Sequence, residues 1–351
     1  MTSSVGARIN KGFLLWMLFS FACAMLIPAI VASREGLALL ARIPLWTALL
    51  LALIVLFAWV LRALVTLLLV QPLLDFKIPF LRLLMLELVV NFFFISTPLG
   101  VGGVIAAAAL VKSYGISLHR VVAISIFSKF IDAFFLVFLL LVTSLVASRY
   151  LATVPFGSAI TTITTLGAFA LIFIWGGLVF FVFRPRAVLA GLIVLCNLLR
   201  VKRKNSNALV FFLLRVKRSV EIFSGIVWWR KLLVGLAAAA YWLAASATLW
   251  VSVIAVGGYI SWDSAVAVQV ISAIPGKVVV LPGGAVVSEI TAIGLLIPAG
   301  GAAMAGASIL LWRLMAFYLP LLLGVLSFFI LSRKRDGAAT RGEGAHRNLQ
   351  G

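Results

Sequence analysis

A small set of ionisable residues lies inside long apolar runs of the sequence, where charged side chains are rare. They are Glu87, Lys129, Asp132, Lys277, Glu289 and Arg313. A charge surrounded by hydrocarbon costs several kcal/mol unless it is paired, so these residues must pair with one another or serve a ligand. Lys129 and Asp132 are three residues apart, a spacing that lets two side chains meet on one helix.

Glu289 and Arg313 allow two interpretations. They can form an ion pair that is purely structural. Alternatively, Arg313 binds an anionic head group through its planar fork of donors, while Glu289 orients Arg313 or meets a cationic group. The two interpretations do not exclude each other.

The elements that carry these residues must be membrane helices. The chain is 64% hydrophobic and 11% charged, whereas soluble domains average about 45–50% apolar and about 25% charged residues. A helix that crosses about 30 Å of hydrocarbon needs roughly 20 apolar residues. We predict an all-α polytopic membrane protein with six full spans: Phe13–Val31, Leu45–Leu61, Val121–Val146, Ile160–Phe183, Leu232–Val256 and Met304–Leu331.

Two further apolar stretches, Leu83–Val111 and Ser264–Pro298, are interrupted by proline and glycine. The breaks are expected at Ser96–Gly103, at Ile274–Gly276 and at Leu281–Gly284. Proline removes a backbone donor and glycine is a poor helix former, so each break should end one half-helix and begin another. Backbone groups freed in this way must be buried in protein or line a wet cavity.

The distribution of basic residues predicts how these stretches cross the membrane, because cytoplasmic loops are enriched in Lys and Arg. Arg8 and Lys11 place the N-terminus inside, and Arg333–Arg335 place the C-terminus inside. Residues 184–231 carry eleven basic residues and one acidic residue, so they are also inside. All of these basic segments fall on the cytoplasmic side if the two interrupted stretches are re-entrant hairpins of opposite orientation. Such an arrangement is typical of transport sites. Two kinked ordinary spans remain the alternative.

The chain is expected to form one membrane domain, residues 1–331, with two related halves at about 1–147 and 160–331. Residues 186–225 are predicted to form helices that lie on the cytoplasmic surface, with basic residues reaching lipid phosphates, and a solvated loop is the alternative. Residues 332–351 are expected to be a disordered basic cytoplasmic tail. We expect the plasma (inner) membrane of a bacterium as the location.

Several functional classes lack support in the sequence. The two histidines, His119 and His346, are far apart, and no phosphate loop or histidine–carboxylate cluster accompanies them. Cys23 and Cys196 support neither a disulfide nor a metal site. We therefore expect no enzyme activity, no cofactor and no metal. No nucleic acid is expected as a partner either, because the positive charge lies in loops between apolar runs.

Two groups of residues resemble the lysylphosphatidylglycerol synthase transmembrane (flippase-like) family. The second group, Leu281-Pro282-Gly283-Gly284 followed by Glu289, Gly300-Gly301 and Arg313, is similar to the family's Pro-Gly-Gly turn with a following glutamate and an arginine in the next helix. The first group is Thr97–Gly103, Tyr114–Ser117 and Ser128–Asp132. The breaks and the charges together give the candidate substrate-binding residues: Glu87, Pro98, Gly102, Gly103, Lys129, Asp132, Pro282, Gly283, Gly284, Glu289 and Arg313.

The resemblance implies movement of a phospholipid or lipid-linked intermediate between leaflets. Its bifunctional members carry a cytosolic aminoacyl transferase, which we do not expect here, since the sequence ends about twenty residues after the last span. The leading hypothesis is a translocase whose partners are membrane lipids with anionic head groups. The alternative is a non-transporting membrane partner of a glycosyltransferase or lipid-modifying enzyme. Whether the chain forms a homo-oligomer stays open.

Overall fold

The computed structural model describes residues 11–73, 77–96, 118–146, 227–278 and 286–331, with isolated positions such as Gly103 and Tyr150. These residues form helices and contain no strand. The α-helices are α1 (Lys11–Ala41), α2 (Leu45–Val70), α3 (Phe80–Ser96), α5 (Leu118–Val146), α10 (Trp228–Ala255), α11 (Trp262–Val278), α12 (Val287–Leu296) and α13 (Gly301–Arg313). Short 3₁₀ turns, η1 (Gln71–Leu73) and η4 (Ile297–Ala299), and a π-helical turn, η5 (Leu314–Tyr318), complete the order.

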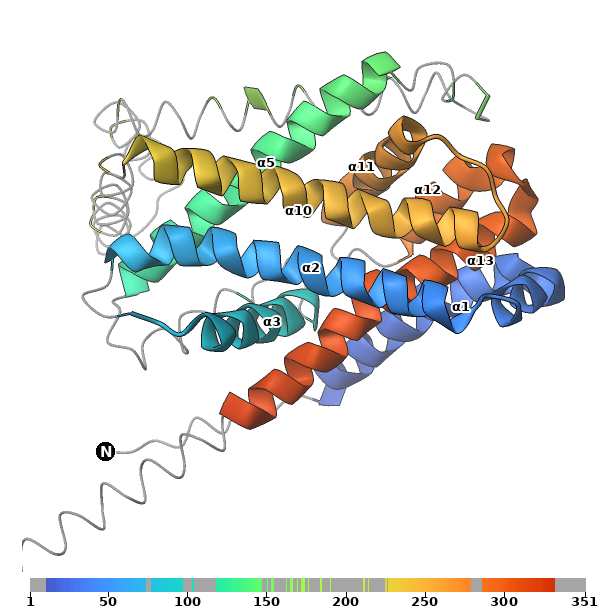
Figure 1. The fold of residues 1–351 in the computed structure, drawn as a ribbon, viewed down its shortest axis with the longest axis horizontal. Coiled ribbons are helices and arrows are strands. Elements are labelled where there is room, and N and C mark those ends of the chain that lie inside the picture. Colours follow the sequence, from blue (N-terminus) through green and yellow to red (C-terminus); the bar gives the residue numbers. More distant parts are fainter. Residues whose placement is uncertain are drawn as a thin grey trace, which may run out of the picture.

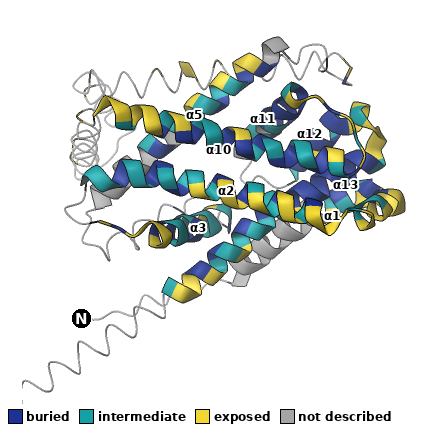
Figure 2. Ribbon diagram, in the orientation of Figure 1, coloured by how far each residue is buried: buried dark blue, intermediate teal, exposed yellow. Residues whose placement is uncertain are grey.

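The centre of the fold is a pair of long helices, α2 and α10, that pack side by side and run in opposite directions (Figure 1). Leu45–Val70, Trp228–Ala255 and the continuous helical run Gly301–Leu331 are each long and apolar enough to cross a membrane. Figure 2 shows exposed residues along the outer sides of α2 and α10. Many of them are leucine, and such surfaces are stable only in lipid. The chain is therefore an all-α integral membrane protein, as predicted.

The predicted spans agree with several helices, but the predicted end of the second span was wrong. The span expected to end at Leu61 continues as α2 to Val70, so Arg62 lies inside the helix rather than in a cytoplasmic connection. The residues after Arg62 are again apolar, and Arg62 has a carboxylate partner that compensates its charge. The predicted span 160–183, the surface helices at 186–225 and the tail 332–351 lie almost wholly outside the described residues.

Helix α1 packs along α13, and the two backbones cross at a glycine. At Gly306, an added Cβ would lie 2.4 Å from the backbone nitrogen of Ala32 and 2.8 Å from the carbonyl oxygen of Pro28. Close to this crossing α1 is interrupted at Ser33, which has φ 58° and ψ −169°. The interruption follows two residues after Val31, the predicted end of the first span.

The second interrupted stretch forms an antiparallel pair, α11 and α12 (Figure 1). The expected break at Ile274–Gly276 was wrong, because α11 continues through Pro275 to Val278. A proline leaves a backbone carbonyl of the preceding turn without its hydrogen-bond donor. In a membrane protein, neighbouring helices can satisfy that carbonyl, so an internal proline is tolerated. The hydroxyl of Ser288 donates to the carbonyl oxygen of Ser272 at 2.8 Å, near the break.

At the far ends of this pair, the Tyr259 N–H donates to the carbonyl oxygen of Ala299 at 3.4 Å. The stretch therefore leaves and returns to the same end of the fold.

In the first interrupted stretch, the structure describes α3 and the position of Gly103. Helix α3 ends at Ser96, where the break was predicted. A Cβ on Gly103 would lie 2.7 Å from the Cβ of Phe94 and 3.1 Å from the carbonyl oxygen of Val90, both in α3. The absence of a side chain at Gly103 thus lets the chain lie directly on α3.

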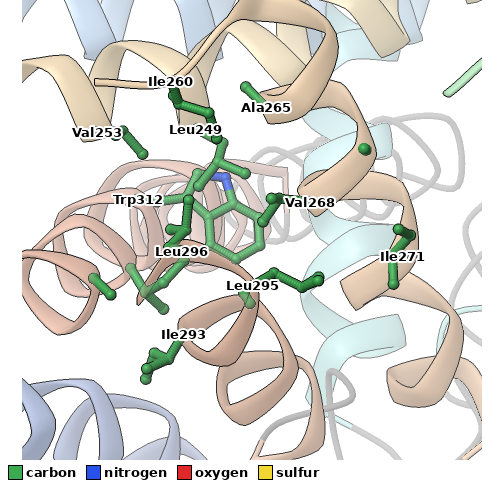
Figure 3. Packing of buried hydrophobic residues seen from close by; sticks show 14 of the residues in the cluster. Leu249, Val253, Ile260, Ala265, Val268, Ile271, Ile293, Leu295, Leu296 and Trp312 are labelled. Atoms are coloured by element: carbon green, nitrogen blue, oxygen red, sulfur yellow. The ribbon is translucent and has the colours of Figure 1, made fainter. Parts of the chain in front are cut away.

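The main core lies between α10, α11, α12 and α13, with the Trp312 ring near its middle (Figure 3). Leu249 of α10, Val268 of α11 and Leu296 of α12 surround this ring (Figure 3). A second cluster joins α2, α3 and the first half of α10 through residues such as Val65, Leu83 and Val234. The two clusters fix the helices that carry the buried charges.

Candidate functional site

A buried ion pair joins α12 to α13. The Nε of Arg313 lies 2.6 Å from Oε1 of Glu289, and the two side chains are 8% and 0% exposed. By strict hydrogen-bond geometry, neither carboxylate oxygen of Glu289 has a partner within the described part of the chain, although the backbone N–H groups of Val286 and Glu289 lie close to the carboxylate. The charges compensate each other, while hydrogen-bonding capacity remains unused.

Aromatic rings hold the guanidinium of Arg313 on two sides. Its Cζ lies 4.8 Å from the ring centre of Trp312 and 5.1 Å from that of Phe317. Phe317 belongs to the π-helical turn that follows Arg313 directly. Single π-helical turns inside α-helices occur frequently at functional sites. Here the turn carries Phe317, and both rings lie close enough to the guanidinium for cation–π attraction.

The backbone before Glu289 is strained. Val286, the residue before the first turn of α12, has φ 76°, although a β-branched side chain disfavours this region. Such a conformation costs about 1–3 kcal/mol and persists only where the surrounding packing enforces it. Glu289 is the third residue of α12, so its position depends on this strained entry into the helix.

A second charged cluster centres on Arg62 of α2. Its Nη1 lies 2.5 Å from Oδ1 of Asp132, and its Nη2 donates to Oγ of Ser128 at 2.9 Å, both on α5. The guanidinium also lies 5.6 Å from the ring centre of Tyr241 on α10. The Arg62 and Asp132 side chains are 12% and 16% exposed, so this pair is slightly more accessible than the pair of Glu289 and Arg313.

A further carboxylate stands beside this cluster. The hydroxyl of Thr66, one helical turn after Arg62, donates to Oε1 of Glu87 on α3 at 2.5 Å. The bond from Thr66 to Glu87 thus ties α2 to α3, while the bond from Arg62 to Asp132 ties α2 to α5. Both helices that flank the first break are held by one span.

The structure brings together only some of the predicted site residues. The expected pairing of Glu289 with Arg313 is present. Glu87 and Asp132 both lie near Arg62, and Asp132 bonds to Arg62. Lys129 and Lys277 lie in α5 and α11, but their side chains are not described, and Pro98, Gly102, Pro282, Gly283 and Gly284 lie outside the described residues. Gly103 packs against α3. The predicted role of these residues in substrate binding stays a prediction.

The sequence reading missed Arg62, Thr66 and Tyr241. A signal for Arg62 existed, because the apolar run continues from Ala63 to Val70 and places Arg62 well inside a helix. No sequence pattern indicates Tyr241, since its role depends on the packing of α10 along α2.

The fold and the paired buried charges define a polytopic membrane protein with polar centres inside its helical bundle. A family model described as the lysylphosphatidylglycerol synthase TM region matches residues 11–324. The chain therefore belongs to this membrane-protein family, which is associated with lipid handling. A comparison with curated proteins finds no match.

Proposed function

We propose that the protein is a flippase-like translocase that moves a phospholipid or a lipid-linked intermediate across the plasma membrane. The observation that carries this proposal is the buried pair of Glu289 and Arg313, which follows the interruption between α11 and α12. A fully buried pair with unused hydrogen bonds adds little stability, so a ligand role accounts for it better than a structural one.

The arrangement also suits the task. A polar head group crossing the bilayer needs charged and hydrogen-bonding groups in the interior, and interrupted helices supply free backbone groups there. Arg313 offers a planar fork suited to phosphate, and Arg62 with Asp132 and Glu87 offers a second polar centre. In this proposal the two interrupted stretches are re-entrant hairpins of opposite orientation, both termini are cytoplasmic, and no chemical reaction is catalysed.

The test is reconstitution of the full chain in liposomes with a panel of fluorescent phospholipids and lipid-linked sugars, read as exposure of the labelled lipid to an impermeant quencher. We expect protein-dependent exchange of at least one lipid class, and Arg313→Gln and Glu289→Gln should slow it at least tenfold. The matched control is Arg42→Gln, because Arg42 is exposed outside the helices.

Absence of exchange across the whole panel would contradict the proposal. If Arg313→Gln and Glu289→Gln also left pathway output in cells intact, the protein would instead act as a non-transporting partner of a lipid-modifying enzyme or a glycosyltransferase.

A further inference from the structure

One arginine, Arg62 of α2, lies within reach of two carboxylates that belong to different helices. It binds Oδ1 of Asp132 on α5 at 2.5 Å. The negative charge of Glu87 on α3 also stabilises its guanidinium. Thr66, one turn further along α2, holds Oε1 of Glu87 at 2.5 Å. Because one turn advances about 5.4 Å, an arginine side chain that starts one turn away can reach the carboxylate of Glu87 as well.

The other contacts of Arg62 allow it to change partner. Its guanidinium lies 5.6 Å from the ring centre of Tyr241 on α10. A ring face attracts a cation without fixing the direction of its N–H groups, so this contact can persist whichever carboxylate Arg62 binds. Ser128, on the same helix as Asp132, accepts from Nη2 at 2.9 Å. A move to Glu87 therefore breaks both bonds to α5 and keeps the contact with α10.

The bonds from Arg62 matter for how α5 is held. Among the described helices, α5 packs mainly against α11 and less extensively against α2. Helix α3, by contrast, is fastened to α2 by buried apolar side chains such as Val65 and Leu83. Loss of the Arg62 bonds would therefore loosen α5 on α2 while α3 stayed in place. Since α11 belongs to the second interrupted stretch, α5 links that stretch to the first polar centre.

We propose that Arg62 is a latch with two positions. In the structure it binds Asp132 and holds α5 on α2; in the second position it binds Glu87 and releases α5. The guanidinium is paired with a carboxylate in both positions, so neither position leaves a buried arginine uncompensated. Asp132 is 16% exposed, so water can solvate its carboxylate once Arg62 has moved. The role of the latch in transport, which is to let α5 move as a head group passes, rests on the proposed function.

The test compares the effect of Glu87→Gln on the unfolding equilibrium constant in two backgrounds of the full chain, measured with SDS in mixed micelles. In the wild type, glutamine still accepts from Thr66, so the constant should rise by about threefold or less. In Asp132→Asn, Arg62 relies on Glu87, so the same substitution should raise the constant by about tenfold or more. Glu87→Asp keeps the charge but is one methylene shorter. If Arg62 contacts Glu87 directly, the effect of Glu87→Asp should also be several-fold larger in Asp132→Asn than in the wild type.

Two controls show whether this coupling runs through Arg62. When Arg62→Gln is added to Asp132→Asn, the effect of Glu87→Gln should return to about threefold or less. Glu35→Gln removes an exposed carboxylate of α1 and should have the same small effect in both backgrounds. Equal effects of Glu87→Gln in the wild type and in Asp132→Asn would overturn the latch, and so would equal effects of Glu87→Asp. A failure of Asp132→Asn to fold would also overturn it, because Glu87 would then not replace Asp132.

Lipid exchange in liposomes tests the role in transport separately. Glu87→Gln keeps the first position and removes the second, so it should slow exchange by about tenfold or more although the protein stays folded. Exchange at the wild-type rate would exclude the latch from transport. A wild type that moves no lipid would contradict the proposed function alone, and the unfolding comparison would still decide whether Arg62 changes partner.

Discussion

Arg62 and Thr66 lie one helical turn apart on α2, and each holds a carboxylate from a different helix. Arg62 binds Asp132 of α5, and Thr66 donates to Glu87 of α3. Since α3 leads into the first interruption and α5 follows it, one span fixes both sides of that break. A related arrangement occurs near the second break, where Arg313 of α13 binds Glu289 of α12.

The first prediction concerns the coupling between Arg62 and Asp132. Each single substitution to alanine should lower the free energy of unfolding by roughly 1–3 kcal/mol, because it leaves a mostly buried charge without its partner. The double variant should lose at least about 1 kcal/mol less than the sum of the two singles. Unfolding by SDS in mixed micelles measures all four proteins. The exposed Arg34→Ala serves as the control and should change stability by less than about 0.5 kcal/mol. Additive single effects would show that the contact contributes no energy.

The sequence was sufficient for the class of fold, because the length of each apolar run and the bilayer thickness together determine a membrane helix. It was also sufficient for the ends of α3 and α5, where the pattern changes sharply. It failed at Arg62 and at Pro275, for one common reason. Both residues usually end a membrane helix, and here each lies inside one; for Arg62 the compensating partners come from distant parts of the chain. The local sequence pattern does not show contacts with partners that are distant in the sequence.

The second prediction concerns the Glu289 and Arg313 pair. Arg313→Leu should destabilise the protein by about 3–5 kcal/mol, since it leaves the carboxylate of Glu289 buried and unpaired. The double variant Glu289→Met/Arg313→Leu removes both charges and should recover most of this loss. SDS unfolding monitored by tryptophan fluorescence gives the comparison.

Arg313→Lys supplies the matched control for this pair. It keeps the charge but loses the planar group that lies against Trp312 and Phe317. The free energy of unfolding should therefore fall between those of the wild type and Arg313→Leu. If the double variant were as unstable as Arg313→Leu alone, shape rather than charge would explain the site.

The third prediction concerns the crossing of α1 and α13. Gly306→Ala should destabilise the protein by roughly 1–3 kcal/mol, because its Cβ would overlap backbone atoms of Ala32 and Pro28 that cannot move independently. Gly235→Ala in α10 is the matched control, since nothing lies within 4 Å of its Cβ position. There alanine should stabilise the helix by about 0.5–1 kcal/mol. Melting temperatures of the two purified variants should therefore shift in opposite directions, and a shift in the same direction would contradict the close crossing.

Part of the candidate site could be predicted from the sequence. Glu289 and Arg313 were found because each is a lone charge in an apolar run, and their pairing followed from the need for compensation. The aromatic rings on Arg313 were not predicted, although Trp312 is its neighbour in sequence. Phe317 lies in the π-helical turn that follows Arg313. No residue pattern in the sequence predicts that turn, so the contact of Phe317 with the guanidinium could not be predicted.

The fourth prediction concerns Tyr150, in the connection after α5. Its hydroxyl donates to the carbonyl oxygen of Leu295 in the last turn of α12 at 2.6 Å. Burial raises the pKa of Tyr150 to about 12, from an ordinary value of 10.0. The folded chain thus keeps the proton that the unfolded chain loses first. The contribution to stability is complete below pH 10 and falls as the pH rises from 10 to 12.

Tyr150→Phe should accordingly lower the free energy of unfolding by about 0.5–1.5 kcal/mol at pH 8, the usual contribution of one hydrogen bond. The difference between wild type and variant should then narrow above pH 10, because the wild type alone loses this contribution. SDS unfolding at pH 8, 9.5 and 11 measures it, with Tyr259→Phe as the control because that side chain is 87% exposed. A difference that stayed constant or widened with pH would mean that the hydroxyl of Tyr150 does not hold the end of α12.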